Sequence, residues 1–284
     1  MKIDYLIRAH TAPEQLARLV ERLDDGDVRF YVHVNSLTDD AVFDAMRERL
    51  SGREHVVWLP RVACRWGGFS LLQATLVGIE AILASGDLPD HAVLLSGQDY
   101  PLKPPAEIRA HLAERQGRNL VHHFHLPAQE WAGEGGGLNR LRYPYFERFR
   151  YKTRLLRLPV PRRLPAGLEP YGGMALWALT GETLAWLMRF LAERPGVLKF
   201  FRHTKMPDET FFQTVLLSSP LADTVDSELL HYLDWSTGSA HPATLRAADL
   251  PKLRASGMLF ARKFDAELDS EILDLLDAEP AHAP

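Results

Sequence analysis

Cysteine is almost absent from this 284-residue chain, which contains only Cys64. A single cysteine excludes an internal disulfide framework and indicates a reducing compartment. The first residues lack the continuous hydrophobic stretch of a signal peptide, and no apolar run approaches the length that spans a bilayer. We therefore expect a cytoplasmic protein.

Glycine-rich phosphate-binding motifs are missing as well. No GxGxxG follows the first predicted strand, and GxxxxGK[ST] does not occur in the chain. These absences argue against a dinucleotide-binding Rossmann enzyme and against a P-loop NTPase.

The first half of the chain contains regularly alternating strand and helix signals. Short apolar runs predict strands, and apolar residues at helical spacing predict helices between them. A capping box from Thr11 to Glu14 is expected to start the first helix. The alternation predicts an α/β fold with a mostly parallel sheet flanked by helices. Strands are expected at 3–9, 28–34, 56–59, 92–95, 120–124 and 174–179, and helices at about 12–23, 39–50, 69–84, 105–115, 181–191 and from 207.

Residues 92–103, AVLLSGQDYPLK, contain the central strand signal and the turn that ends it. Open parallel sheets bind ligands just beyond the carboxyl ends of their strands, where this stretch places Asp99. An ordinary turn capped by Asp99 fits the same letters. The stretch alone does not decide between a site and a turn.

Residues 139–164 are rich in arginine and aromatic residues and follow a glycine-rich loop at 133–137. Such a segment is suited to nucleic acid, an anionic membrane surface or a charged acceptor. The structural alternative is a long excursion that covers the sheet. Because the chain has a net charge of −4 and no nucleic-acid-binding module, we favour an acceptor-side or membrane-facing loop.

The segment PDETFFQ, beginning at Pro207, has the features of a helix N-terminus. Its acidic residues, Asp208 and Glu209, fit the helix dipole in the simplest interpretation. However, Glu209 lies beside aromatic residues in sequence, and a partly apolar pocket would raise its pKa.

Five motifs occur in the order found in one known family: HTAPEQLARLVERL, LLSGQDYPL, PDETFFQTVLLSSP, Asp234-Trp235 and LFARKFD. Together they resemble the core-2/I-branching enzyme family, which holds β-1,6-N-acetylglucosaminyltransferases and peptide O-xylosyltransferases. The resemblance covers nearly the whole chain. Arg65-Trp66-Gly67-Gly68 with Asp234-Trp235 and FARKF is closer to the xylosyltransferase branch.

The resemblance implies an inverting, metal-independent glycosyltransferase with a GT-A-type fold that uses a UDP-sugar. Glu209 matches the general base of the family, and Lys263 with Arg262 matches the cations that neutralise the leaving diphosphate. No DxD ends the central strand, which agrees with a metal-free site, and Asp25-Gly26-Asp27 reads as a polar turn. The remaining expected donor-binding residues are His10, Asn35, Arg65, Trp66 and Asp99, and the expected acceptor-side residues are Asp208, Trp177, Asp234, Trp235, Arg148 and Arg150.

Three departures from the family pattern matter. Asn35 stands where the family usually has an aspartate for the nucleoside, and its amide oxygen can still accept a hydrogen bond from a base N–H. The more apolar GGMALWALT at 172–180 indicates an altered acceptor subsite. The membrane anchor and disulfides of animal members are absent, which argues against a secretory glycoprotein as acceptor.

Three histidines lie close together in the sequence. His122, His123 and His125 suggest a metal only weakly, because no acidic partner lies near them in sequence.

The sequence thus predicts one glycosyltransferase domain, 1–284, with a nucleotide-sugar half at 1–125 and an acceptor and catalytic half at 126–284. GlcNAc and xylose are the leading donor sugars, no metal or other cofactor is expected, and the acceptor is a glycan, lipid-linked or protein glycoconjugate. Peripheral contact with the inner face of the membrane is left open, and nucleic acid is not expected. The alternative function is a catalytically silent nucleotide-sugar or carbohydrate-binding protein of the same fold, against which the retained Glu209 and Lys263 argue.

Overall fold

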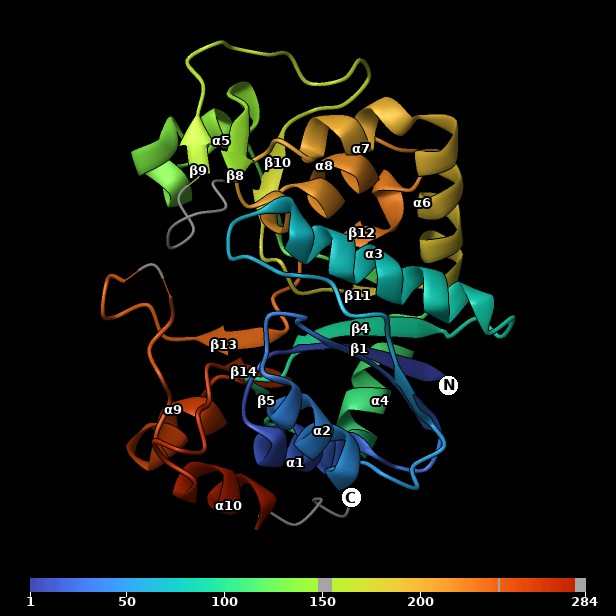
Figure 1. Cartoon of the computed structure of the whole chain (residues 1–284), viewed down its shortest axis with the longest axis vertical. Coiled ribbons are helices and arrows are strands. Elements are labelled where there is room, and N and C mark those ends of the chain that lie inside the picture. Colours follow the sequence, from blue (N-terminus) through green and yellow to red (C-terminus); the bar gives the residue numbers. More distant parts are fainter. Residues whose placement is uncertain (148–154, 240, 279–284) are drawn as a thin grey trace. The chain divides into compact units, whose positions relative to one another are not determined.

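The structure is a computed structural model that describes residues 1–147, 155–239 and 241–278 (Figure 1). The chain forms two compact units, each assembled from separate stretches. The first unit takes Met1–Leu59, Pro89–Gln116 and Leu229–Pro284, and the second takes Pro60–Leu88 and Gly117–Glu228. These boundaries differ from the predicted halves 1–125 and 126–284, so the single domain and its functional division stay predictions.

A parallel sheet lies at the centre of the first unit. Its strands run in the order β4 (His91–Ser96), β1 (Ile3–Ala9), β2 (Val28–Val34) and β3 (Val56–Trp58), and every pair is parallel. Nearly all residues of β4, β1 and β2 are buried, which explains why these strands read as continuous apolar runs rather than alternating ones. The predicted α/β class is confirmed.

Helices α1 (Pro13–Leu23) and α2 (Asp40–Arg49) follow β1 and β2 and lie side by side (Figure 1). Leu16, Leu19 and Leu23 of α1 are fully buried, as their helical spacing predicted. The predicted capping box is wrong, because α1 begins after Ala12 with no side-chain cap, and Pro13 occupies its first turn. In α2, by contrast, the Asp39 carboxylate accepts a hydrogen bond from Ala41 N–H at 2.9 Å.

A second, small sheet of the first unit pairs segments that are far apart in sequence. It has the order β13 (His231–Leu233), β14 (Phe260–Arg262) and β5 (Asp99–Pro101). Since only two residues separate the end of β4 from the start of β5, this sheet continues directly from the carboxyl end of the central strand. The remaining helices of this unit are α4 (Pro105–Ala113), η4 (Ala247–Asp249), α9 (Leu250–Ala255) and α10 (Glu271–Asp277).

The second unit is built mainly from helices and short strands. Helix α3 (Phe69–Ala84) has the predicted bounds and contacts α6 (Gly181–Glu193). The strand expected at 120–124 is divided into two short strands that pair with different partners, and only Ala178–Leu179 of the strand expected at 174–179 forms a strand. The unit's other elements are β6 (Asn119–Leu120), β7 (His123–His125), η1 (Gln129–Glu134), α5 (Leu138–Arg142), β8 (Tyr145–Glu147), β9 (Leu155–Arg157), β10 (Tyr171–Gly173), β11 (Ala178–Leu179), α7 (Pro195–Phe201), η2 (Pro207–Glu209), α8 (Phe211–Leu217), η3 (Ala222–Thr224) and β12 (Val225–Asp226).

In the part of the chain that the structure describes, none of the helices combines the length and the apolar composition needed to cross a membrane.

Candidate active site

Asp99 is a fully buried carboxylate where β4 passes into β5. Its Oδ2 accepts a hydrogen bond from Ser96 N–H at 2.7 Å, and its Oδ1 accepts one from Arg262 Nη1 at 2.8 Å. His231 Nε2 lies 3.3 Å from Oδ2. Burial by itself raises the pKa of Asp99, but Arg262, His231 and the Ser96 N–H outweigh it, so the net pKa lies below the usual value. Asp99 is therefore ionised.

The burial of Asp99 corrects its predicted role. A side chain with no exposed surface does not present itself to a donor, and its charge is used to hold Arg262, whose side chain is 25% exposed. Asp99 thus holds Arg262 in place and has no exposed surface of its own for a ligand. His231, buried against Phe260 with ring centroids 5.1 Å apart, was not predicted from the sequence, where one histidine in a short apolar run gives no signal.

The backbone around Lys263 is fixed on several sides. Leu245 N–H donates to the Lys263 carbonyl at 2.8 Å, and the next residue, Phe264, donates its N–H to Gln98 O at 2.9 Å. Buried Gln15 also bonds through Nε2 to Gly97 O at 3.0 Å and to Phe264 O at 3.2 Å. This framework places the Lys263 side chain directly after the anchored Arg262.

Among the residues that the structure describes, none hydrogen bonds to or forms an ion pair with the Lys263 ammonium, which is half-buried. The positive charges of Arg262 and Lys263 contribute to lowering the pKa values of two histidines. The pKa of His10 is lowered by partial desolvation and by Arg262 and Lys263, and that of His241 by partial desolvation and by Lys263 and Arg262. A lysine and an arginine held together in this way form a site suited to an anion.

Three other predicted residues of this unit have defined surroundings. The Asn35 amide oxygen accepts a hydrogen bond from Leu37 N–H at 3.1 Å, so part of its acceptor capacity is used in a turn. The Asp234 carboxylate caps another turn by accepting from Ser236 N–H at 2.8 Å, and these bonds to Ser236 lower its pKa. The Trp235 ring is 52% exposed and remains accessible to a ligand.

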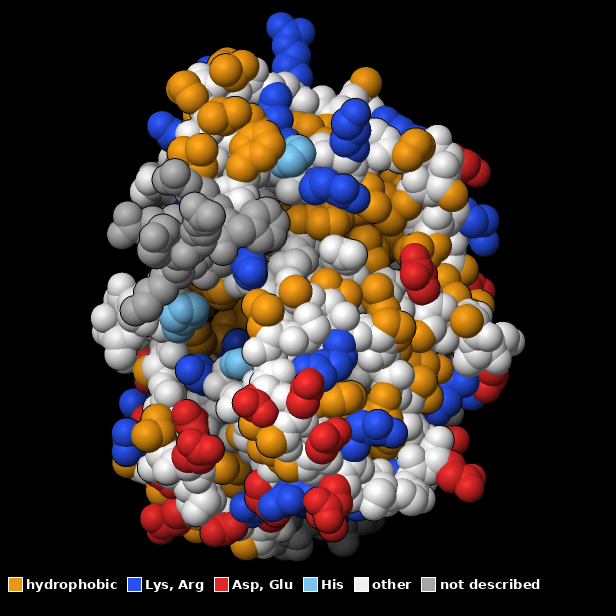
Figure 2. Space-filling view, in the orientation of Figure 1, with side chains coloured by type: hydrophobic (Ala, Val, Ile, Leu, Met, Phe, Trp, Pro, Cys, Tyr) orange, Lys and Arg blue, Asp and Glu red, His pale blue; other side chains and the backbone are white. Residues whose placement is uncertain are grey.

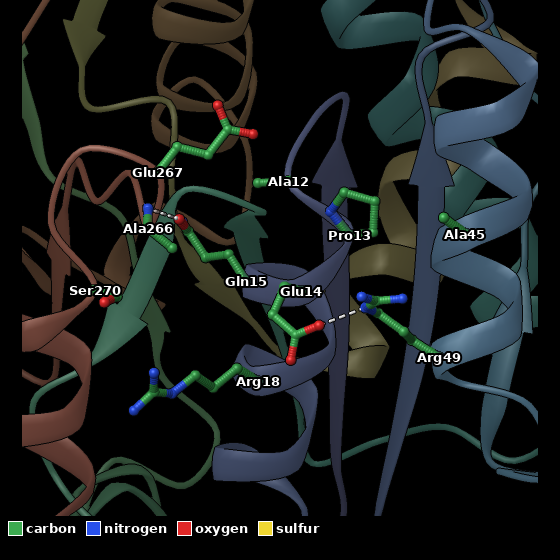
Figure 3. A pocket seen from close by; sticks show the side chains of 10 residues that line it. All are labelled: Ala12, Pro13, Glu14, Gln15, Arg18, Ala45, Arg49, Ala266, Glu267 and Ser270. Atoms are coloured by element: carbon green, nitrogen blue, oxygen red, sulfur yellow. Dashed lines mark hydrogen bonds and ion pairs between the residues drawn. The ribbon is translucent and has the colours of Figure 1, made fainter.

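A pocket of about 300 Å³ lies at the start of α1 (Figure 3). Glu14 and Arg49 face each other across it at 2.5 Å, and Gln15 Oε1 accepts a hydrogen bond from Ala266 N–H at 2.9 Å. No predicted site residue is among those that line it. The pocket is therefore separate from the residues expected to form the site.

In the second unit, Glu209 ends the short turn η2, directly before α8. Its side chain is 24% exposed, and its Oε2 accepts a hydrogen bond from Arg140 Nη1 at 2.5 Å. The surroundings of Glu209 are therefore not the apolar ones expected from its sequence neighbours, because a guanidinium lies against the carboxylate. The adjacent Asp208 is buried, which limits direct contact with an acceptor.

The loop that contains Arg65 and Trp66 lies next to the turn that contains Glu209. Gly67 O accepts a hydrogen bond from Met206 N–H at 2.8 Å, and α3 contacts η2. Arg65 N–H donates to Ser70 Oγ at 2.8 Å at the start of α3, and the Trp66 ring is 47% exposed. Both residues were predicted to bind the donor, and the structure brings them into the unit of Glu209.

Trp177 is not an acceptor-contacting residue in this structure. It is fully buried, and its ring packs 5.1 Å from that of Phe212 in α8. The apolar segment in which it lies accordingly fills the core. Arg148 and Arg150, also predicted on the acceptor side, lie outside the described residues.

The histidines at 122, 123 and 125, which suggested a metal only weakly, belong to no ligand cluster among the described residues. His123 and His125 do share a face, since both rings contact Tyr171, at centroid distances of 6.2 and 5.1 Å. Within residues 1–147, 155–239 and 241–278, no group of three or more histidine, cysteine, aspartate or glutamate side chains is arranged to hold a metal ion.

Comparison with known proteins identifies the family. Residues 3–255 match the model of the core-2/I-branching enzyme family. The chain therefore belongs to that family. This confirms the family resemblance drawn from the motifs.

Xylosyltransferases are among the similar proteins. One from Ciona intestinalis is 28% identical over 296 residues, which cover 98% of this chain and 34% of that protein. Xylosyltransferase 2 of Rattus norvegicus is 28% identical over 301 residues, with coverages of 98% and 33%. The chain thus spans about a third of the length of these relatives. The apo crystal structure of mouse xyloside xylosyltransferase 1 is 13% identical, with a TM-score of 0.41, covering 91% of this chain and 97% of that one.

The buried Asp99 gives a prediction for stability. Asp99→Asn leaves Arg262 and His231 without their anionic partner and should lower the free energy of unfolding at pH 7 by about 2–3 kcal/mol, since Arg262 is partly exposed. Because the folded-state pKa of Asp99 is lowered, its stabilisation is present above the unfolded pKa of about 3.9 and is lost as the pH falls further. Urea unfolding from pH 7 down to about pH 3 should show the two proteins converging in acid. Asp44→Asn, at an exposed position, is the control, and an equal loss there would contradict the assignment.

Proposed function

We propose that this chain is an inverting glycosyltransferase that moves a sugar from UDP to a hydroxyl group of a glycan or glycoconjugate. The observation that carries the proposal is the pair Arg262 and Lys263, anchored by buried Asp99 and by the backbone bonds around residue 263. GlcNAc and xylose are the leading sugars, and xylose is supported by the names of the similar xylosyltransferases.

The reaction needs two kinds of group. As the acceptor oxygen bonds to the anomeric carbon, the bond from that carbon to the diphosphate breaks, and negative charge develops on the departing UDP. Arg262 and Lys263 stabilise this charge. Glu209 accepts the proton that the acceptor hydroxyl loses. Attack from the face opposite the leaving group inverts the anomeric configuration.

The same two cations support catalysis without a metal. A divalent ion in a glycosyltransferase neutralises the diphosphate, and here a lysine and an arginine supply two positive charges for that purpose. We therefore propose no metal and no other cofactor.

The acceptor is a glycan, a lipid-linked sugar or a protein. The exposed Trp235 ring offers a stacking surface for a sugar. The described arginines of the basic segment 139–164 have three kinds of surroundings. Arg140 bonds to Glu209, Arg162 bonds to the carbonyls of Leu141, Phe200 and His203, and other arginines are exposed.

The exposed part of this segment supports contact with an anionic membrane. Phe146 and Leu156 are a cross-strand pair of the β8–β9 hairpin and are 39% and 46% exposed. Figure 2 shows hydrophobic side chains gathered over α5, β8 and β9, with Lys and Arg side chains beside them. We propose peripheral binding at the inner face of the membrane through this surface, made of Phe146, Leu156, Leu158, Val160, Arg142, Arg157 and Arg163.

Glu209→Gln keeps the shape of the side chain and removes the proton acceptor. We expect kcat to fall by about 10²-fold or more while UDP-sugar affinity stays similar. Single-turnover transfer and calorimetry measure the two quantities. Glu193→Gln, at an exposed position of α6, is the matched control. Near-normal turnover in Glu209→Gln would assign the base elsewhere.

Chelation tests the absence of a metal. Turnover should be unchanged after dialysis against EDTA, because Arg262 and Lys263 carry the charge of the leaving group. Activity that disappears in EDTA and returns with manganese or magnesium would show that a metal is required.

His10 should report on donor binding. Partial desolvation, followed by the positive charges of Arg262 and Lys263, lowers its pKa, so bound UDP should raise that pKa by neutralising these charges. Binding then takes up protons, and UDP affinity should increase as the pH falls through the His10 titration. NMR titration of the ring with and without UDP measures the shift. His55, which precedes β3 at the amino end of the parallel strands whereas His10 follows the carboxyl end of β1, is the control. An unchanged His10 pKa in saturating UDP would place the diphosphate elsewhere.

The proposed membrane-binding surface should act independently of donor binding. Replacing Arg142, Arg157 and Arg163 by Gln should weaken binding to phosphatidylserine-rich vesicles by about 10²-fold, at about 1 kcal/mol for each charge. UDP-sugar affinity should not change. The control replaces three other exposed basic residues, Arg47, Lys252 and Arg254. Equal losses in the two triple variants would show that net charge, rather than this surface, is responsible.

A further inference from the structure

Gln15, in the first turn of α1, is 1% exposed, and its side-chain amide bonds to three backbone groups. Nε2 donates to Gly97 O at 3.0 Å and to Phe264 O at 3.2 Å, and Oε1 accepts from Ala266 N–H at 2.9 Å. Figure 3 shows the bond to Ala266. Because a primary amide has two N–H groups, both donors of this buried side chain are used.

Two of these bonds lie just beyond the end of a strand. β14 ends at Arg262, so its pairing with β13 and β5 does not include Lys263 or the residues after it. Phe264 O and Ala266 N–H are bonded to Gln15 instead of to a neighbouring strand. A helix side chain thus fixes the chain where the sheet ends, next to the residue that carries the proposed function.

Helix α1 is a firm support for this amide. All three of its leucines are fully buried, and the helix contacts β5. Groups supported by packed helices are held more precisely than groups supported by loops. The third bond, from Gln15 to Gly97 O, joins the same amide to the turn that precedes Asp99. One side chain therefore connects the segment that contains Asp99 with the segment that contains Lys263.

Lys263 depends on this support more than Arg262 does. The Arg262 guanidinium bonds to Asp99 at 2.8 Å. Within the described ranges of the chain, the half-buried Lys263 ammonium has no hydrogen bond or ion pair, so its backbone limits the positions that it can reach. A shift of about 1 Å in a group that contacts the reacting atoms can cost about 10²-fold in rate.

We infer that Gln15 is a positioning residue for Lys263, because it fixes residues 264–266 so that the ammonium meets the diphosphate of the donor. This inference rests on the proposed role of Lys263 at the leaving diphosphate. Glutamine matches the three backbone groups, with two donors for two carbonyls and one acceptor for one N–H. A glutamate would place a carboxylate against both carbonyl oxygens.

The test is a double-mutant cycle on the affinity for UDP, measured by calorimetry. Lys263→Met should weaken binding by about 10–100-fold, since it removes a charged hydrogen-bond donor. Gln15→Met, which is similar in length and has no amide, should weaken binding by about 10-fold. In a protein that already has Lys263→Met, Gln15→Met should cause almost no further loss, because no ammonium is left to position.

Asn119→Leu is the matched control for the loss of a buried amide. Asn119, in the second unit, is 1% exposed, and its amide also joins two segments. Nδ2 donates to Thr224 Oγ1 at 2.9 Å, and Oδ1 accepts from Thr180 N–H at 3.1 Å. This variant should lower thermal stability and leave UDP affinity within a few-fold of wild type.

All affinities are compared at a temperature where circular dichroism shows every variant to be folded. If Gln15→Met does not fold, Gln15→Asn replaces it in the cycle. Its amide is one methylene shorter and cannot reach both segments, but it keeps a polar group at the buried position. The same coupling to Lys263→Met is expected, with a smaller loss of affinity.

The outcomes separate this inference from the proposed function. If Lys263→Met weakens UDP binding and the Gln15 variant does not, the leaving-group site stands and the positioning role is wrong. Additive losses in the double variant, or an equal loss of affinity in Asn119→Leu, would also overturn it. If Lys263→Met leaves UDP affinity unchanged, the proposed leaving-group site itself fails, and the inference fails with it.

Discussion

The ion pair between buried Asp99 and Arg262 is the constraint on which the first unit's site depends. A carboxylate without solvent is tolerated only with a charged or hydrogen-bonding partner, and Asp99 finds these partners at the end of β4, in β14 and in β13. Asp99, through Arg262 and His231, therefore joins three segments that are distant in sequence. Lys263 follows directly after the residue that is anchored, so the same interaction helps to fix the backbone from which its side chain extends.

Each unit contains an arginine–carboxylate pair, and opposite members of the two pairs are buried. In the first unit the carboxylate of Asp99 has no exposed surface, and Arg262 is 25% exposed. In the second unit the Arg140 side chain is 10% exposed, and Glu209 is 24% exposed. In each pair the more exposed member is the one that the proposed chemistry requires, a cation for the diphosphate and a carboxylate for the acceptor proton. The buried member fixes its place.

The fold was more predictable from the sequence than the site. The buried parallel strands are apolar runs in the sequence, and α3 has apolar residues at helical spacing, so both could be predicted directly. The predicted capping box was wrong because α1 begins at Pro13, after Ala12, without a side-chain cap. The site depends on pairs that local patterns do not link, since Arg262 and Asp99 are 163 residues apart and Arg140 and Glu209 are 69 apart. Trp177 was expected on the acceptor side, and only its packing against Phe212 shows that it belongs to the core.

The most direct test of the central claim is the anomeric configuration of a transferred sugar. The protein is incubated with a panel of α-linked UDP-sugars and a mixture of glycan acceptors, the products are found by mass spectrometry, and the new linkage is assigned by NMR. The account predicts a β-linked product from at least one of these donors. An α-linked product would contradict single displacement with Glu209 as base, and binding of UDP-sugars without any transfer would show that the chain is a nucleotide-sugar-binding protein instead of an enzyme.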